Sequence, residues 1–118
     1  MFAQLMGLPV ISPRDLHIRL QSEPLVVFDV NAESRWLESR VPGALHLDPQ
    51  AFTDSDLPTD RDAVLVFYCS NPLCRKAPNA AQRARRMGHR NVLVMAAGIS
   101  GWLAASLPTE SGAQPKRA

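Results

Sequence analysis

The sequence has few of the features that define membrane, extracellular or nucleic-acid-binding proteins. It contains only two cysteines in 118 residues, too few for a disulfide framework, which predicts a reduced, cytoplasmic protein. No run approaches the roughly 18 apolar residues of a membrane span. The first residues, MFAQLMGLPVISP, lack the basic start and long apolar stretch of a signal peptide. The net charge of +2 is too small to indicate a nucleic-acid partner.

The remaining composition is that of an ordinary globular domain. Hydrophobic residues make up 46% of the chain and charged residues 20%. A chain of this length can bury a core without disulfides, and no internal repeat divides it. We therefore expect a single domain over residues 1–108, followed by a flexible polar tail over residues 109–118.

Charge is divided unevenly along the chain. Residues 29–62 contain eight acids and three arginines, whereas residues 75–90 contain six basic residues and no acid. Basic segments commonly form a solvated helix face. The alternative is a positive field around the cysteines, which would favour an anionic substrate or an acidic partner.

Apolar runs alternate with helix-like segments. Ser12-Pro13 is typical of a helix start, and this helix is expected to run to about Gln21. Further helices are expected around Trp36, over residues 78–87 and after Gly98. Strands are predicted at four apolar runs, 24–30, 44–47, 63–68 and 91–96. Strands that alternate with helices predict a three-layer α/β domain with a mostly parallel sheet.

Both cysteines lie in one short loop, YCSNPLCRK, between the strongest predicted strand and an Arg-rich helix. Cys69 is the first residue after the strand, and sites form at the carboxyl ends of parallel strands. The amides of a tight strand-to-helix turn, the helix N-terminus and the cations Arg75 and Lys76 all favour negative charge there. Such surroundings lower the pKa of a thiol. We therefore predict that Cys69 is an ionised, reactive nucleophile.

Other roles for the two cysteines remain open. Cys69 could instead be a buried, inert residue that ends a strand. Cys74 is a candidate resolving thiol, which would form a disulfide with an oxidised or persulfidated Cys69, or else a small apolar side chain that fills space. A zinc site needs about four ligands. Neither a metal nor another cofactor is expected, because the histidines are scattered along the chain at His17, His46 and His89.

The order of these segments resembles that of the single-domain rhodanese family. The similarity extends from VISPRDL to LPTE and includes VPGALHL, the strand that leads to Cys69, and NVLVMAAGISGW. It implies a sheet of about five mostly parallel strands with helices on both faces. It also implies that Cys69 carries sulfane sulfur as a persulfide. The sulfur would come from a donor such as thiosulfate and pass to a thiophilic acceptor such as cyanide or another thiol.

The resemblance assigns roles to further residues. Loop amides and Arg75 would hold the donor and the persulfide, and the expected substrate-binding set is Ser70, Asn71, Leu73, Cys74, Arg75 and Lys76. Structural roles at a strand end, in a turn and in the core would fall to Asp29, Gly98 and Trp102.

The loop departs from the usual sulfurtransferase pattern. Ser70 replaces the basic residue after the cysteine, and Pro72 or Leu73 stands where glycine is expected. Arg75 follows Cys69 after five residues, as in tyrosine phosphatases and rhodanese-like arsenate reductases, whose loops surround a tetrahedral oxyanion. Pro72 has no N–H to offer such an oxyanion. A phosphatase or arsenate reductase is therefore the second alternative, and a persulfide carrier or binding module without multiple turnover is the third.

Overall fold

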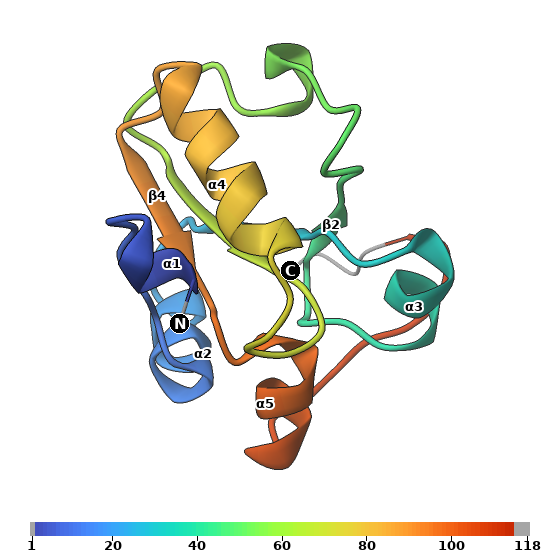
Figure 1. The fold of residues 1–118 in the computed structure, drawn as a ribbon. Coiled ribbons are helices and arrows are strands. Elements are labelled where there is room, and N and C mark those ends of the chain that lie inside the picture. The colour runs from blue at the N-terminus through green and yellow to red at the C-terminus, as the bar shows by residue number, and fades with distance from the viewer. Residues whose placement is uncertain (1, 115–118) are drawn as a thin grey trace.

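The structure, a computed structural model, describes residues 2–114. Within them a central sheet carries helices on both faces (Figure 1). The α-helices are α1 (Phe2–Leu5), α2 (Pro13–Leu20), α3 (Glu33–Glu38), α4 (Lys76–Arg86) and α5 (Gly98–Ala104), and one 3-10 helix, η1, spans Asp54–Asp56. The strands are β1 (Val26–Asp29), β2 (Leu45–His46), β3 (Val64–Tyr68) and β4 (Asn91–Val94).

The strands are all parallel and lie in the order β2-β1-β3-β4, which confirms the predicted α/β class. The four strands correspond to the four predicted apolar runs, whereas the family resemblance implies about five strands. Beyond these four there is one isolated bridge, in which Val10 pairs in parallel with Val94 at the edge of β4. Pro9 and Pro13 flank this short segment. Because proline cannot donate a backbone hydrogen bond, the pairing does not extend further.

Side chains that alternate along the strands build two cores, one on each face of the sheet. Phe28 and Phe67 belong to the core that includes residues of α1 and α4, and the buried face of α4 is mostly alanine, which lets this helix lie close to the sheet. Tyr68 belongs to the second core, with residues of α2 and α5. Trp102 is completely buried there, and its indole N–H donates to the Pro108 carbonyl at 2.7 Å.

Most element boundaries lie close to those that the sequence predicts. Ser12 caps α2, since its hydroxyl accepts a hydrogen bond from the Asp15 amide at 3.1 Å. Helix α4 begins at Lys76 rather than near Pro78, so its first turn follows the cysteine loop directly. The short helix α1 has no predicted counterpart. No helix of residues 2–114 combines the length and apolar character that crossing a membrane requires.

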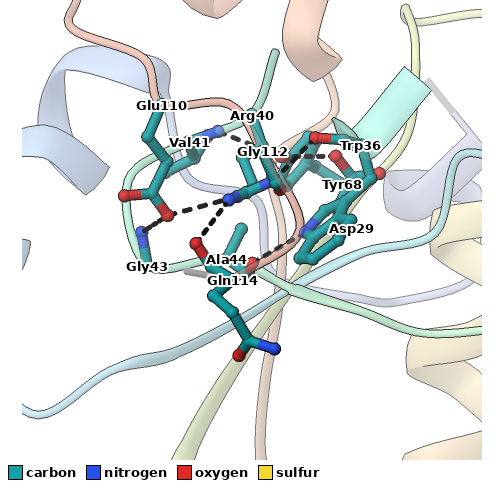
Figure 2. Close-up of polar contacts among 10 residues, drawn as sticks. All are labelled: Asp29, Trp36, Arg40, Val41, Gly43, Ala44, Tyr68, Glu110, Gly112 and Gln114. Carbon is teal, nitrogen blue, oxygen red and sulfur yellow. Dashed lines mark hydrogen bonds and ion pairs between the residues drawn. The ribbon is translucent and has the colours of Figure 1, made fainter. Parts of the chain in front are cut away.

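Residues 109–114 are joined to the domain through Arg40, whose side chain is fully buried. The guanidinium donates from Nε to the Glu110 carboxylate at 3.2 Å, and from Nη1 and Nη2 to the carbonyls of Gly112 and Gln114 at 2.7 and 3.0 Å (Figure 2). The Gly112 amide donates to the Leu37 carbonyl at 3.0 Å. The sequence predicts a flexible tail from residue 109; the division at residue 108 stays a prediction, and residues 115–118 lie outside the described part.

Candidate functional site

The loop that carries both cysteines runs from the carboxyl end of β3 into α4, with the start of α5 beside it (Figure 1). The carbonyls of Cys69 and Ser70 accept hydrogen bonds from the amides of Ile99 and Ser100 in α5, at 2.9 and 3.0 Å. Gly98 permits this approach, because its φ is +67° and a Cβ there would lie 2.5 Å from the Ser70 carbonyl carbon. Gly98 therefore allows the backbone at the start of α5 to pack directly against the backbone of the cysteine loop.

Replacing Gly98 by alanine is expected to destabilise the fold and displace the loop. The positive φ costs an alanine about 1–2 kcal/mol. The clash with loop backbone adds strain that no rotamer change relieves, so we expect a total loss of about 2–4 kcal/mol in the free energy of unfolding. Gly43→Ala is the matched control, because Gly43 has a φ of +80° but no atom within 4 Å of its Cβ position. Urea denaturation measures both; equal losses would contradict the supporting contact.

The Cys69 thiol is almost completely buried, with 3% of the residue exposed. Its Sγ lies 3.7 Å from the carbonyl oxygen of Cys74, to which it donates. Burial is the largest influence and, with the Cys74 thiol, raises the pKa of Cys69 to about 12, while the amides of Ala77 and Ser70 act in the opposite direction. The prediction of an ionised Cys69 is therefore wrong for this conformation. The amides do point at the sulfur, but desolvation outweighs them.

Cys74 is the more accessible of the two free thiols. Its partial burial raises its pKa, but hydrogen bonds from the Cys69 thiol and from the amides of Lys76 and Ser70 outweigh this and hold the pKa of Cys74 below its ordinary value. The two thiols therefore act as a pair. In this conformation the surroundings disfavour the thiolate form of Cys69 and favour that of Cys74.

A small cavity beside the Cys69 sulfur is closed by the N-terminal helix. Its volume is about 10 Å³, which is close to the space needed by one water-sized group. Phe2 and Ala3 of α1 form one wall, and Pro72 and Cys74 of the loop form another. The rest of the lining is Ala77, Pro78, Val94, Met95 and Ala96. None of the described residues that line this cavity carries a charge.

The two cations at the entrance of α4 do not line this cavity. The Arg75 guanidinium lies 4.5 Å from the centre of the Phe2 ring, in a cation–π contact. Lys76 instead lines a separate hollow at the carboxyl ends of β1 and β2. Arg75 and Phe2 together therefore hold α1 against the cysteine loop, and in this closed arrangement neither cation stabilises a Cys69 thiolate.

The other residues of the predicted substrate-binding set are only partly brought together. Cys74 lines the cavity, and Ser70 directs its amide at the Cys69 sulfur. Asn71 orders the loop itself, since its side-chain oxygen accepts from the Leu73 amide at 2.9 Å. The Leu73 side chain points outward, with 73% of the residue exposed. The site is therefore built from loop backbone and the two thiols rather than from polar side chains.

Larger hollows lie outside the cysteine cavity. The hollow of about 300 Å³ that contains Lys76 also contains Glu33 and Asp48. Another, of about 750 Å³, lies at α2, α5 and the start of β1 and is lined in part by His17 and Trp102. Neither hollow includes a cysteine. Across the described residues, no three His, Cys, Asp or Glu side chains gather closely enough to hold a metal ion.

Opening the cavity by the change Phe2→Ala is expected to expose Cys69. Hydration would lower the pKa of Cys69 toward its ordinary value, so alkylation by iodoacetamide near neutral pH should accelerate at least about tenfold, the factor that one pKa unit represents. Leu5→Ala is the control, because Leu5 lies on the same helix but is 79% exposed and does not line the cavity. Fragment-ion mass spectrometry distinguishes Cys69 from Cys74. An unchanged rate at Cys69 would contradict a closing role for Phe2.

Asp29 lies at the end of β1, is buried, and pairs in register with Tyr68 of β3 (Figure 2). Its carboxylate accepts hydrogen bonds from the Tyr68 hydroxyl at 2.7 Å and from the Asn31 amide at 2.8 Å. Burial raises the pKa of Asp29, and these hydrogen bonds oppose that shift. The Tyr68 hydroxyl also accepts from the Val41 amide at 3.1 Å. Because Tyr68 immediately precedes Cys69, this network joins the base of the loop to the end of β1 and to the segment between α3 and β2.

Three residues with structural roles are not identified from the sequence: Phe2 and Tyr68, which lie beside the loop, and Arg40, which binds residues 110–114. Tyr68 carries the one signal that was available, since it is the single tyrosine of the chain and ends an otherwise apolar strand beside the cysteine. Phe2 stands in a short apolar segment without periodicity, and Arg40 has no local pattern around it. Their roles depend on contacts with distant parts of the chain.

Comparison with known proteins agrees with this architecture. Residues 12–105 match the family profile described as Rhodanese-like domain. The HTH-type transcriptional regulator Rv0324 of Mycobacterium tuberculosis is 30% identical over 94% of this chain, which spans only 50% of the regulator's length. The thiosulfate sulfurtransferase GlpE of Actinobacillus succinogenes is 29% identical, with 90% of this chain and 94% of the relative covered.

A solved structure shows the same fold. The BH2092 protein from Bacillus halodurans has a TM-score of 0.80 at 22% identity, with 92% of this chain and 80% of that chain covered. The shared arrangement is the α/β rhodanese fold, here with four parallel strands between helices. Because the family profile covers most of the chain and includes the strand, cysteine loop and helix described above, the chain belongs to the rhodanese-like domain family.

Proposed function

We propose that this protein is a sulfurtransferase that carries sulfane sulfur as a persulfide on Cys69 and passes it to a thiophilic acceptor. The observation that carries the proposal is the apolar cavity of about 10 Å³ beside the Cys69 sulfur, which offers space for one further small atom. The amides of Ser70 and Ala77 point at this sulfur and would stabilise negative charge on a persulfide. The relatives named thiosulfate sulfurtransferase support a thiosulfate-like anion as the donor.

Loading would proceed by nucleophilic displacement. The Cys69 thiolate attacks the sulfane sulfur of thiosulfate, the S–S bond of the donor breaks, and sulfite leaves with the bonding electron pair. The cavity as it stands is too small to admit the donor, so Phe2 must move first. Its displacement also releases the Arg75 guanidinium, which can then meet the incoming anion with its planar pair of donors. Opening of α1 therefore admits the donor and frees a cation to bind it.

The same geometry is poorly suited to phosphate or arsenate. A tetrahedral oxyanion requires several converging donors, whereas Pro72 offers no N–H and Arg75 is held on the Phe2 ring. The apolar lining of the Cys69 cavity adds no side-chain donor other than the Cys74 thiol. A persulfide carrier without multiple turnover remains a variant of the proposal, and differs from it only in the acceptor.

Steady-state assays with two substrates test the proposed function. With thiosulfate as donor and cyanide as acceptor we expect thiocyanate to form, slowly, because Ser70 supplies no positive charge beside Cys69. With p-nitrophenyl phosphate we expect no hydrolysis. Phosphate release without thiocyanate formation would overturn the proposal. A single stoichiometric loading without turnover would instead identify the domain as a persulfide carrier.

A further inference from the structure

We infer that Cys74 is a second reacting residue, which discharges the Cys69 persulfide as hydrosulfide and thereby makes a dithiol the acceptor class of this site. The inference depends on the proposed persulfide of Cys69. It adds the route by which the sulfur leaves the protein and the chemical class of the compound that regenerates the thiols.

The geometry of the loop brings the two thiols together. Cys74 is the one nucleophile besides Cys69 among the described residues that line the Cys69 cavity. Both residues line this one cavity, and the thiol of each influences the pKa of the other. The loop holds this arrangement, because the Cys74 amide donates to the Asn71 carbonyl at 3.1 Å and the Cys69 thiol donates to the Cys74 carbonyl at 3.7 Å. A disulfide between the two limbs of so tight a loop therefore requires little movement of the chain.

Access favours Cys74 over any dissolved acceptor. With α1 in place, Phe2 and Ala3 cover the Cys69 cavity, so an external thiol cannot approach the Cys69 sulfur in line with the bond to be broken. Cys74 is already in contact and is partly exposed. Hydrogen bonds from the amides of Lys76 and Ser70 also favour its thiolate form, which is the form that attacks a sulfur–sulfur bond.

The discharge step balances as a thiol–disulfide exchange. The Cys74 thiolate attacks Sγ of the Cys69 persulfide, and a new bond forms between the two cysteine sulfurs. The bond from the Cys69 Sγ to its outer sulfur breaks, and the outer sulfur leaves with that electron pair and its proton as hydrosulfide. The sulfane sulfur gains two electrons, and the two cysteines lose two electrons in forming the disulfide.

Regeneration requires a reductant, and a dithiol fits best. One thiolate of the dithiol attacks the partly exposed Cys74 sulfur, and the Cys69 thiolate leaves. The second thiol of the reductant then attacks the mixed disulfide, closes its own disulfide and releases Cys74. A monothiol needs a second molecule for that last step, so at equal thiol concentration a dithiol should regenerate the protein faster.

An anaerobic time course with one equivalent of thiosulfate tests this route. In the wild-type protein, intact mass should first rise by about 32 Da, the mass of one sulfur atom, and then fall to about 2 Da below the reduced protein as the disulfide forms. About one equivalent of hydrosulfide per chain should appear together with the disulfide. Dithiothreitol should then restore the reduced mass.

The variants Cys74→Ser and Cys74→Ala are first incubated with thiosulfate until each gains about 32 Da, the mass of one sulfur atom. Their release of hydrosulfide is then measured without added thiol. Both should release hydrosulfide at least about tenfold more slowly than the wild type, because the attacking thiolate is absent. Cyanide should still remove the sulfur from both, which shows that the persulfide is chemically competent. Equal hydrosulfide release from wild type and variants would overturn the inference, as would a wild-type gain of about 32 Da that persists or moves to Cys74. No mass gain in any protein would overturn the proposed function as well.

Discussion

Cys69→Ser is expected to lose all sulfur loading and all transfer to cyanide, the largest functional effect of any single change in the chain. A serine hydroxyl cannot hold sulfane sulfur as a persulfide and is a far weaker nucleophile than a thiolate at neutral pH. Cys74 lines the same cavity, but we expect no loading there, because the Ala77 amide acts on the Cys69 sulfur. The measurements are intact mass after incubation with thiosulfate and the rate of thiocyanate formation.

The fold of the Cys69→Ser variant has to be checked, because the residue is buried. The hydroxyl can donate to the Cys74 carbonyl that the thiol now faces, so we expect a loss of only about 1 kcal/mol in the free energy of unfolding. Urea denaturation distinguishes this from a folding defect. A folded Cys69→Ser protein that still gained one sulfur would move the persulfide to Cys74 and contradict the assignment of roles within the loop.

Arg40→Met is expected to cause the largest loss of stability, about 3–5 kcal/mol in the free energy of unfolding. The Arg40 side chain is fully buried and contacts the carboxylate of Glu110, itself 7% exposed. Its Nη1 also donates to the Trp36 carbonyl at 2.9 Å, and its Cζ lies 4.0 Å from the centre of the Trp36 ring (Figure 2). Methionine retains much of the volume but none of the donors, so buried carbonyls lose their partners.

The guanidinium also joins segments that are far apart in sequence. It binds residues 110–114 to the end of α3, next to the chain that continues to β2. Arg40→Lys should lose nearly as much stability, because a single ammonium cannot reproduce several fixed donors. Arg90→Ala is the matched control, since the Arg90–Asp62 ion pair is 64% and 66% exposed and surface pairs contribute about 0–1 kcal/mol. Equal midpoints for Arg40→Met and Arg90→Ala in urea would contradict the role of Arg40.

The fold and the position of Cys69 at the end of a strand could be predicted because both depend on local patterns. Continuous apolar runs such as that at residues 63–68 mark strands buried on both faces, and helix signals such as Ser12-Pro13 lie next to the residues that they affect. The position of Cys69 at a strand end follows from the same patterns. The short connection between β3 and α4 also explains why backbone amides are directed at the Cys69 sulfur.

The properties of the site that sequence did not predict depend on distant contacts. The raised pKa of Cys69 results from burial, and part of that burial comes from Phe2 and Ala3 at the other end of the chain. Arg75 is next to Cys74 in sequence, but its direction is set by the Phe2 ring. Charge near a cysteine in the sequence is therefore insufficient to predict a thiolate, because desolvation by a remote segment can exceed it.

The most direct test of the central proposal is to locate the sulfur itself. The wild-type protein is incubated with thiosulfate, trapped by rapid alkylation, and the peptide that contains both cysteines is analysed by fragment-ion mass spectrometry. We predict an additional mass of about 32 Da, one sulfur atom, between Cys69 and its alkyl group, in a peptide whose Cys74 is alkylated directly. Any peptide that has already been discharged should instead carry the Cys69–Cys74 disulfide without additional sulfur. An alkylated persulfide on Cys74 with an unmodified Cys69, or no additional sulfur on either residue, would contradict the proposal.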